Sequence, residues 1–278
     1  MVRTPKQGMI PEPPAGADEI ALARRREFRE RGFLRESFAL ADASPLPQLR
    51  RDVALFDAKF EEWKAAGHTG IPYLFTDAIE QVARDAAIRA VVEAVLGTTA
   101  WVVWGPAIFR ETPDAAARWH VDLDARYWPS ISIAVGLSGC SPETVLSYLP
   151  GTNRLAATPF SWRDGADTDR VLRRARRTSP DCGAPEETTG FGDGRFYVFD
   201  GKTWHRGAPG TTTTRLVLFL HYQDAAAARV PLMLDYKRHR WSREPAPFLP
   251  SPSATPVTTL ARLPVWERAL DLAGRLWP

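Results

Sequence analysis

The sequence is organised around Trp119-His120-Val121-Asp122, a short stretch that lies between two runs of strand-forming residues. Side chains at positions i and i+2 of a strand point to the same side, so an imidazole and a carboxylate would project together from this segment. Such a pair can fill two neighbouring positions around one metal ion. The stretch therefore predicts part of a metal site carried by a β-strand.

A third ligand has to come from elsewhere in the chain, and His205 is the best candidate. It lies in Thr203-Trp204-His205-Arg206-Gly207, which follows another predicted strand. Two histidines and one carboxylate on one face of an ion are the ligand set of non-heme Fe(II) oxygenases. We therefore expect His120, Asp122 and His205 to bind one metal ion together.

The region from 98 to 223 reads as a series of short strands separated by turn residues. Ile131–Leu137 has the length and branching of a buried strand, and Val145–Leu149 ends at the strong turn sequence Pro150–Asn153. Further strands are expected at 101–104, 107–110, 195–200 and 215–222. Strands at such intervals are typical of an antiparallel sandwich or barrel.

The region from 17 to 97 is predicted to be a helical layer that packs on these strands. Apolar residues recur at helical spacing in three segments, each followed by a glycine: 18–31, 46–66 and 77–96. Phe33-Leu34 is expected to open a strand after the first helix. The proline-rich residues 1–16 are expected to be a flexible tail.

One domain is expected from 17 to 278. Within it, the long polar segment 158–194 is an insertion that would serve as a lid or be disordered, and 224–278 is a C-terminal extension. The net charge of +3 is small and the basic residues are spread out, so the sequence favours neither nucleic acid nor an anionic membrane as a partner. Without a signal sequence or a long apolar run, we expect a cytoplasmic monomer or homodimer.

Arg215 opens the almost wholly apolar strand that follows His205. A buried arginine at a strand start needs an anion, and its planar guanidinium suits a carboxylate in two-point contact. The alternative is a surface arginine at the end of a strand. From the residues alone both interpretations stay open.

With these motifs in order, the chain resembles the phytanoyl-CoA dioxygenase-like family of Fe(II)/2-oxoglutarate-dependent oxygenases. The resemblance covers roughly residues 100 to 223 and rests on the following motifs: Trp119–Asp122, Tyr148–Arg154, Gly192-Asp193 ahead of Phe196–Phe199, and Trp204–Gly207 followed by Arg215. It implies a double-stranded β-helix, also called a jelly roll or cupin-like barrel. It also implies that His120, Asp122 and His205 bind iron, and that Arg215 holds the distal carboxylate of 2-oxoglutarate.

The sequence departs from the family pattern at Gly207, where many relatives carry a hydroxyl that helps to hold the co-substrate. Thr203, Thr213 or Ser132 could supply that hydroxyl instead, and the sequence does not choose among them. Asp122 is informative because related halogenases have a small residue at its position, which opens a site for chloride. With an aspartate present, hydroxylation or another oxidation is expected.

The resemblance implies conversion of 2-oxoglutarate and O₂ to succinate and CO₂, coupled to hydroxylation of an unactivated C–H bond of a small molecule in bacterial secondary metabolism. Desaturation, epimerisation or ring formation at the same site is one alternative, and a cupin-like binding protein without redox activity is another. Arg118, Arg126 and Trp128 flank the expected ligands and could contact substrate or be ordinary surface groups. The basic run Arg170–Arg177 could clamp an anionic group or be a solvated helix face, and His221 is expected to be structural.

Overall fold

The computed structural model describes residues 19–59, 70–72, 76–111, 119–122, 130–143, 145–155, 173, 176–177, 186–207, 214–224 and 241–242. The helices are α1 (Glu19–Arg31), α2 (Leu46–Lys59), α4 (Asp77–Ala83), α5 (Ala86–Leu96) and the short 3₁₀ helix η2 (Thr152–Arg154). The strands are β1 (Phe38–Ala39), β2 (Gly70–Pro72), β3 (Trp101–Glu111), β4 (Ile131–Ser138), β5 (Val145–Leu149), β6 (Glu187–Gly190), β7 (Arg195–Asp200), β8 (Trp204–Gly207), β9 (Arg215–Asp224) and β10 (Trp241–Ser242). No helix in these ranges is long and apolar enough to cross a membrane.

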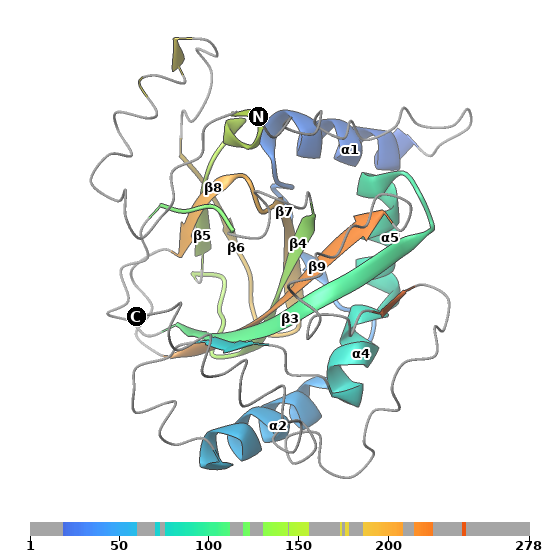
Figure 1. The fold of residues 1–278 in the computed structure, drawn as a ribbon, viewed down its shortest axis with the longest axis vertical. Coiled ribbons are helices and arrows are strands. Elements are labelled where there is room, and N and C mark those ends of the chain that lie inside the picture. The colour runs from blue at the N-terminus through green and yellow to red at the C-terminus, as the bar shows by residue number, and fades with distance from the viewer. Residues whose placement is uncertain are drawn as a thin grey trace, which may run out of the picture.

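Two antiparallel sheets form the centre of the molecule. The larger sheet has the order β1-β7-β4-β9-β3-β10, with β2 also paired to β3, and the smaller one has the order β6-β5-β8. The four described α-helices lie on one side of the larger sheet and the smaller sheet lies on the other (Figure 1). The prediction of a mainly antiparallel β-protein with N-terminal helices is therefore confirmed.

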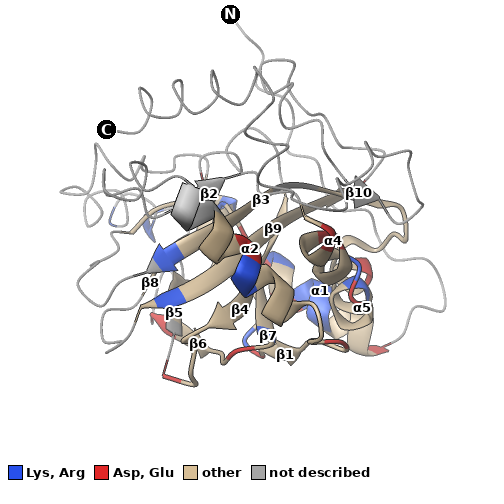
Figure 2. Ribbon diagram, turned by 90° about the horizontal axis from the view of Figure 1, so that it is seen from below, with Lys and Arg blue, Asp and Glu red and all other residues tan. Residues whose placement is uncertain are grey.

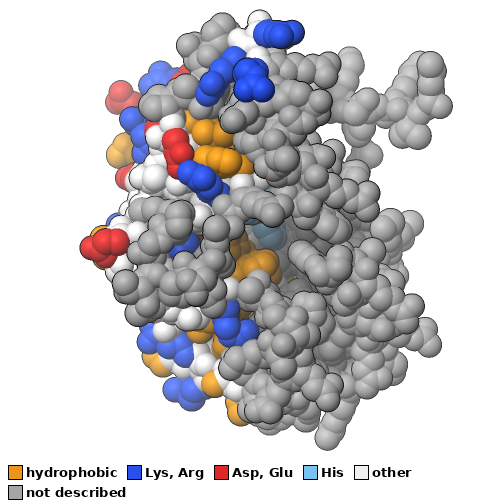
Figure 3. Space-filling model, turned by 90° about the vertical axis from the view of Figure 1, so that its left-hand side faces the viewer, with side chains coloured by type: hydrophobic (Ala, Val, Ile, Leu, Met, Phe, Trp, Pro, Cys, Tyr) orange, Lys and Arg blue, Asp and Glu red, His pale blue; other side chains and the backbone are white. Residues whose placement is uncertain are grey.

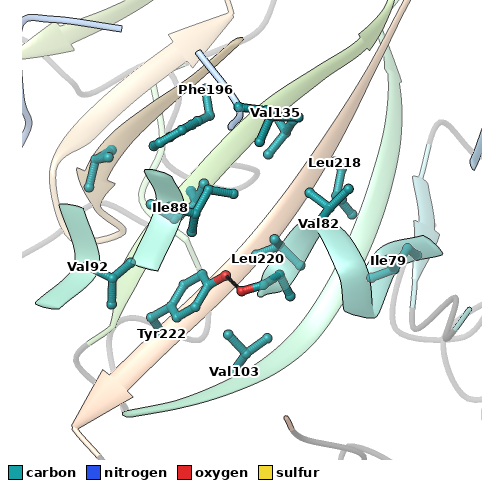
Figure 4. Packing of buried hydrophobic residues seen from close by; sticks show 14 of the residues in the cluster. Ile79, Val82, Ile88, Val92, Val103, Val135, Phe196, Leu218, Leu220 and Tyr222 are labelled. Atoms are coloured by element: carbon teal, nitrogen blue, oxygen red, sulfur yellow. Dashed lines mark hydrogen bonds between the residues drawn. The ribbon is translucent and has the colours of Figure 1, made fainter. Parts of the chain in front are cut away.

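The outer face of the larger sheet packs against the helices. Alternate residues of β9, namely Leu218, Leu220 and Tyr222, join apolar residues of α4 and α5 in the main core (Figure 4). The Tyr222 hydroxyl donates a hydrogen bond of 2.7 Å to the carbonyl oxygen of Ala83 at the end of α4. The helical layer thus covers one face of the sheet and leaves the other face for the site.

The inner face of the larger sheet meets the smaller sheet through a second, largely aromatic cluster. Its members come from β4, β5, β7, β9 and the loops beside them: Phe33, Ala134, Leu146, Tyr148, Phe191, Tyr197, Phe199 and Val217. Strand β4 carries no charged residue, whereas α1 is rich in charge (Figure 2). The space between the sheets is therefore lined mainly by aromatic and small side chains.

The helix predicted at 77–96 is two helices. The break falls at Arg84-Asp85, where the Asp85 carboxylate accepts hydrogen bonds from the amides of Ala87 and Ile88 and so caps the start of α5. The same carboxylate accepts from the amides of Ala41 and Asp42, which lie far away in sequence. The apolar residues keep nearly the same helical spacing on both sides of the break, so periodicity alone predicts one helix.

Several strand boundaries also differ from the prediction. The two strands expected at 101–104 and 107–110 are one strand, β3, with an irregularity between Trp104 and Ala107. Phe33 forms only an isolated bridge to Phe199, and the strand expected there begins later, as β1. A strand, β6, lies within the predicted insertion 158–194, and β10 lies within the predicted C-terminal extension. The tail 1–16 and the end of the second predicted helix lie outside the described residues.

Candidate metal centre

The stretch 119–122 runs beside β8, and this pairing brings the two histidines together. The amide of His120 donates to the carbonyl oxygen of His205 and the amide of His205 donates to that of His120, each at 3.0 Å. The amide of Asp122 donates to the carbonyl oxygen of Gly201 at 2.8 Å. The centroids of the two imidazole rings are consequently 4.3 Å apart.

One ligand atom from each of His120, Asp122 and His205 lies within 4.8 Å of the other two. Asp122 Oδ1 and His205 Nε2 are 3.5 Å apart. Two ligand atoms at about 2.1 Å from one ion and at right angles to each other are roughly 3 Å apart. The three side chains are therefore spaced for one metal ion, with the small inward adjustment that an ion would cause.

The site is open to solvent on one side. The side chain of His205 is 3% exposed, whereas that of Asp122 is 22% exposed. A histidine side chain is visible from outside the molecule beside hydrophobic side chains (Figure 3). A metal ion held by these residues could thus be reached by small molecules, which a closed structural site would prevent.

A chain of hydrogen bonds fixes the orientation of His205. Its Nδ1 lies 2.8 Å from the carbonyl oxygen of Thr203, so Nδ1 carries the proton and Nε2 is left for a metal. The Thr203 hydroxyl donates in turn to the carbonyl oxygen of Gly32 at 2.9 Å. The residue just after α1 therefore supports the turn that leads into β8, the strand that carries the second histidine.

Asp122 is held by two residues of the larger sheet. The Ser132 hydroxyl donates to Asp122 Oδ2 at 3.0 Å and lies 3.1 Å from His221 Nδ1. Because Ser132 has one proton to give, it accepts from a protonated His221 Nδ1. Oδ2 is occupied in this way while Oδ1 faces His205, an arrangement that favours binding of a metal through one carboxylate oxygen.

Three groups around the site have shifted pKa values. Burial raises the pKa of Asp122, but His205, His221 and His120 outweigh burial and hold that pKa at about 2. Burial raises the pKa of Tyr148 well above its ordinary value, and Tyr197 and Asp122 act in the same direction. Asp122 is therefore ionised at neutral pH, as a metal ligand must be, whereas the Tyr148 hydroxyl keeps its proton.

Burial also raises the pKa of Asp200, the last residue of β7, to about 6. Hydrogen bonds from the Lys202 amide and the Asn153 side chain oppose the effect, whereas the charge of Asp122 adds to it. A carboxyl close to the metal ligands thus changes its protonation near neutral pH.

The other residues singled out from the sequence fall into two groups. Arg215 is buried at the start of β9, and its backbone position puts it on the same face of the strand as His221. The hydroxyls of Thr203 and Ser132 are engaged as described above, by Gly32 and by Asp122. The remaining predicted contacts lie outside the described residues: Arg118, Arg126, Trp128, Thr213 and most of Arg170–Arg177.

His221 is the site residue that sequence reasoning missed. The sequence predicts a structural role for His221, because six residues of strand separate it from Arg215. The missing information was the register: Ser132 on β4 is directly opposite His221 on β9. A polar pair facing each other on the inner side of an otherwise apolar sheet is the signal that could have shown it.

No family model matches this sequence, and no curated protein matches it. Solved structures do match: the carbocyclase SnoK of nogalamycin biosynthesis has a TM-score of 0.54 and 15% identity over 77% of this chain and 88% of that one. EctD from S. alaskensis, solved with 2-oxoglutarate and 5-hydroxyectoine, has a TM-score of 0.54 and 16% identity over 74% and 76%. The epimerase SnoN, solved with Fe³⁺, α-ketoglutarate and nogalamycin RO, has a TM-score of 0.51 and 20% identity over 77% and 88%. The chain shares the fold of these proteins.

Proposed function

We propose that this chain is a non-heme Fe(II)/2-oxoglutarate-dependent dioxygenase of the phytanoyl-CoA dioxygenase-like kind. The observation that carries the proposal is the cluster of His120, Asp122 and His205, whose ligand atoms lie within 4.8 Å of one another. Two imidazoles and one carboxylate fit Fe(II) and leave open positions for other ligands. The shared fold with SnoK, SnoN and EctD supports the same reading.

The chain's own residues hold and orient the reactants in this proposal. Bound iron supplies the site at which 2-oxoglutarate and O₂ are converted to succinate and CO₂ while the substrate is oxidised. Ser132 and His221 orient Asp122, and Thr203 orients His205. The aromatic cluster between the sheets keeps water away, which limits side reactions.

Arg215 is proposed to hold the distal carboxylate of 2-oxoglutarate. It is 2% exposed and lies on the same face of β9 as the aromatic Phe219 and as His221. Its guanidinium can meet a carboxylate with two parallel hydrogen bonds. A five-carbon diacid bound at the metal would extend along this face of β9 toward the arginine.

The proposed reaction is hydroxylation of an unactivated C–H bond of a small molecule in bacterial secondary metabolism, by a cytoplasmic monomer or homodimer. Arg118, Arg126 and Trp128 are proposed to contact the substrate. The structural neighbours are a carbocyclase, an epimerase and EctD, so one fold serves several oxidative outcomes. Desaturation, epimerisation and ring formation therefore remain the alternatives to hydroxylation within the same proposal.

The test measures succinate formed from 2-oxoglutarate by the protein reconstituted with Fe(II) in the presence of O₂. The wild type is expected to bind one iron per chain and to form succinate, and His120→Ala is expected to lose both. Arg51→Lys, on the exposed side of α2, is the matched control and is expected to behave as the wild type. Failure of the wild type to bind iron anaerobically would favour the binding-protein alternative and reject the enzyme.

A further inference from the structure

Tyr148 has a buried hydroxyl that the fold itself does not use. The side chain is 1% exposed, and its hydroxyl oxygen has no hydrogen-bond partner among the residues that the structure describes. The ring is well held, stacked on Phe33 with centroids 4.4 Å apart and edge-on to Tyr197 at 6.3 Å. By contrast, the equally buried Tyr222 donates its hydroxyl proton to the Ala83 carbonyl. Buried polar groups without a partner are rare and need an explanation.

The position of Tyr148 places this hydroxyl between the sheets and beside the metal ligands. Tyr148 on β5 is directly opposite His205 on β8, and the two rings are 6.5 Å apart at their centroids. Its ring packs in the inner cluster with Ala134 and Val217 of the larger sheet. The side chain thus lies between the two sheets, next to a candidate metal ligand.

The other hydroxyls considered for the co-substrate are engaged elsewhere or lie outside the described residues. Ser132 donates to Asp122 and Thr203 donates to Gly32. Gly207, which has no side chain to offer, lies opposite Leu146, two residues before Tyr148 on the same face of β5. Tyr148 therefore carries a hydroxyl on the face of the smaller sheet that Gly207 shares, one strand away and diagonal to Gly207.

We propose that the Tyr148 hydroxyl donates a hydrogen bond to a carboxylate oxygen of 2-oxoglutarate bound at the metal centre. It would take the place of the hydroxyl that is missing at Gly207. A neutral hydroxyl that donates to a carboxylate forms a strong, charge-assisted hydrogen bond. The inference rests on the proposed function, and it adds a co-substrate contact to that site.

The test compares Tyr148→Phe with Tyr222→Phe, two variants that each remove one buried hydroxyl. 2-Oxoglutarate is titrated anaerobically into the Fe(II)-loaded proteins and followed by the charge-transfer absorption of the chelate, with calorimetry on the Mn(II)-loaded proteins as a second measurement. Tyr148→Phe is expected to raise the Kd for 2-oxoglutarate about tenfold or more, with an unchanged Kd for the metal and an unchanged or higher melting temperature. Tyr222→Phe is expected to lower the melting temperature and to leave the Kd for 2-oxoglutarate unchanged.

A second arm of the experiment uses 2-oxobutyrate, which lacks the distal carboxylate. Weaker binding of both acids by Tyr148→Phe places the contact at the metal-chelating carboxylate, and weaker binding of 2-oxoglutarate alone places it at the distal one; both outcomes support the proposal. The proposal is overturned if the wild type and Tyr148→Phe bind 2-oxoglutarate with equal affinity, and also if Tyr148→Phe loses affinity for the metal. Neither of these results contradicts the proposed function. If the wild type loaded with Fe(II) binds no 2-oxoglutarate, the proposed function and this inference both fail.

Discussion

Ser132 connects the candidate ligand Asp122 to His221 through one hydroxyl group. Its replacement by alanine leaves the ligand in place but removes the donor that holds Oδ2. Groups that orient a metal ligand typically contribute 10- to 100-fold to metal affinity, so we expect Ser132→Ala to weaken metal binding by about that factor. Anaerobic titration with Co(II), followed by absorption, measures the change.

Two variants control for this effect. Ser132→Thr keeps a hydroxyl and is expected to restore most of the affinity. Ser141→Ala removes the hydroxyl of a partly exposed loop residue that donates to Glu143, and it is expected to leave metal affinity unchanged. Equal affinities of Ser132→Ala and the wild type would show that the hydrogen bond does not orient the ligand.

Asp200 gives a prediction about pH. Its folded-state pKa of about 6 lies above the value of about 3.9 for an unfolded chain, so the folded protein holds this proton more tightly. The contribution of this proton to the free energy of unfolding is fully present below about pH 4 and is lost as the pH rises through 6. Asp200→Asn, which keeps an acceptor for the Lys202 amide, is expected to be more stable than the wild type by about 2 kcal/mol at pH 8 and by little at pH 4.

Urea unfolding of both proteins at the two pH values tests this expectation. A difference in free energy of unfolding that is the same at pH 4 and pH 8 would contradict it.

At the level of single residues, the sequence predicts which candidate ligands come together, but not the groups that contact them. His120 and Asp122 are recognisable because strand parity is a local property. Ser132 was considered only as a contact of the co-substrate, and Tyr148 only as part of a turn motif. Their partners depend on which strands face each other across the molecule, and strand pairing is not encoded in any short segment.

Among the elements, the junction between α4 and α5 makes the sharpest prediction. Asp85 accepts hydrogen bonds from four backbone amides, two at the start of α5 and two in the segment 41–42. Loss of a helix cap alone costs roughly 1 kcal/mol, and loss of the two part-buried hydrogen bonds to segment 41–42 adds about as much again, so Asp85→Ala is expected to lower the free energy of unfolding by about 2 kcal/mol.

Denaturant unfolding of Asp85→Ala and Asp85→Asn measures this contribution. The asparagine keeps one acceptor oxygen and is expected to lose about half as much. If Asp85→Ala lowers the free energy of unfolding by no more than the loss of an ordinary helix cap does, the hydrogen bonds from Asp85 to segment 41–42 do not contribute to stability.

The elements that the sequence predicts correctly are those with a strong apolar pattern. Strands β4, β5, β7 and β9 have such patterns and fall where they are expected. Strand β6 does not, because Glu187-Thr188-Thr189-Gly190 is polar and short, and it is a strand only because β5 pairs with it. The sequence does not predict the break at Asp85, because two of the four amides that stabilise it lie in the distant segment 41–42, which a local pattern cannot show.

For the molecule as a whole, metal binding should be linked to stability. The three candidate ligands are brought together only by folding, so a metal that binds them stabilises the folded state. At a free metal concentration of 100 times Kd the gain is about 2.7 kcal/mol, which for a chain of this size raises the melting temperature by roughly 5–10 °C. Thermal unfolding with and without Mn(II) measures the shift.

His205→Ala provides the comparison, because it keeps the strand but removes one ligand. It is expected to show little or no shift at the same metal concentration. An equal shift in the variant and the wild type would mean that the metal binds elsewhere.

The carbonyl group of Gly32 joins the helical layer to the metal centre. It accepts from the Thr203 hydroxyl and from the Asp200 amide, and the Thr203 carbonyl in turn lies next to His205 Nδ1. A side chain at position 32 would collide with the Thr203 hydroxyl, so the approach is as close as the backbone allows. The end of α1 and the position of His205 are therefore coupled. A change that weakens the packing of α1 should lower the affinity of the site for a metal, and a bound metal should strengthen the packing of α1 by the same free energy.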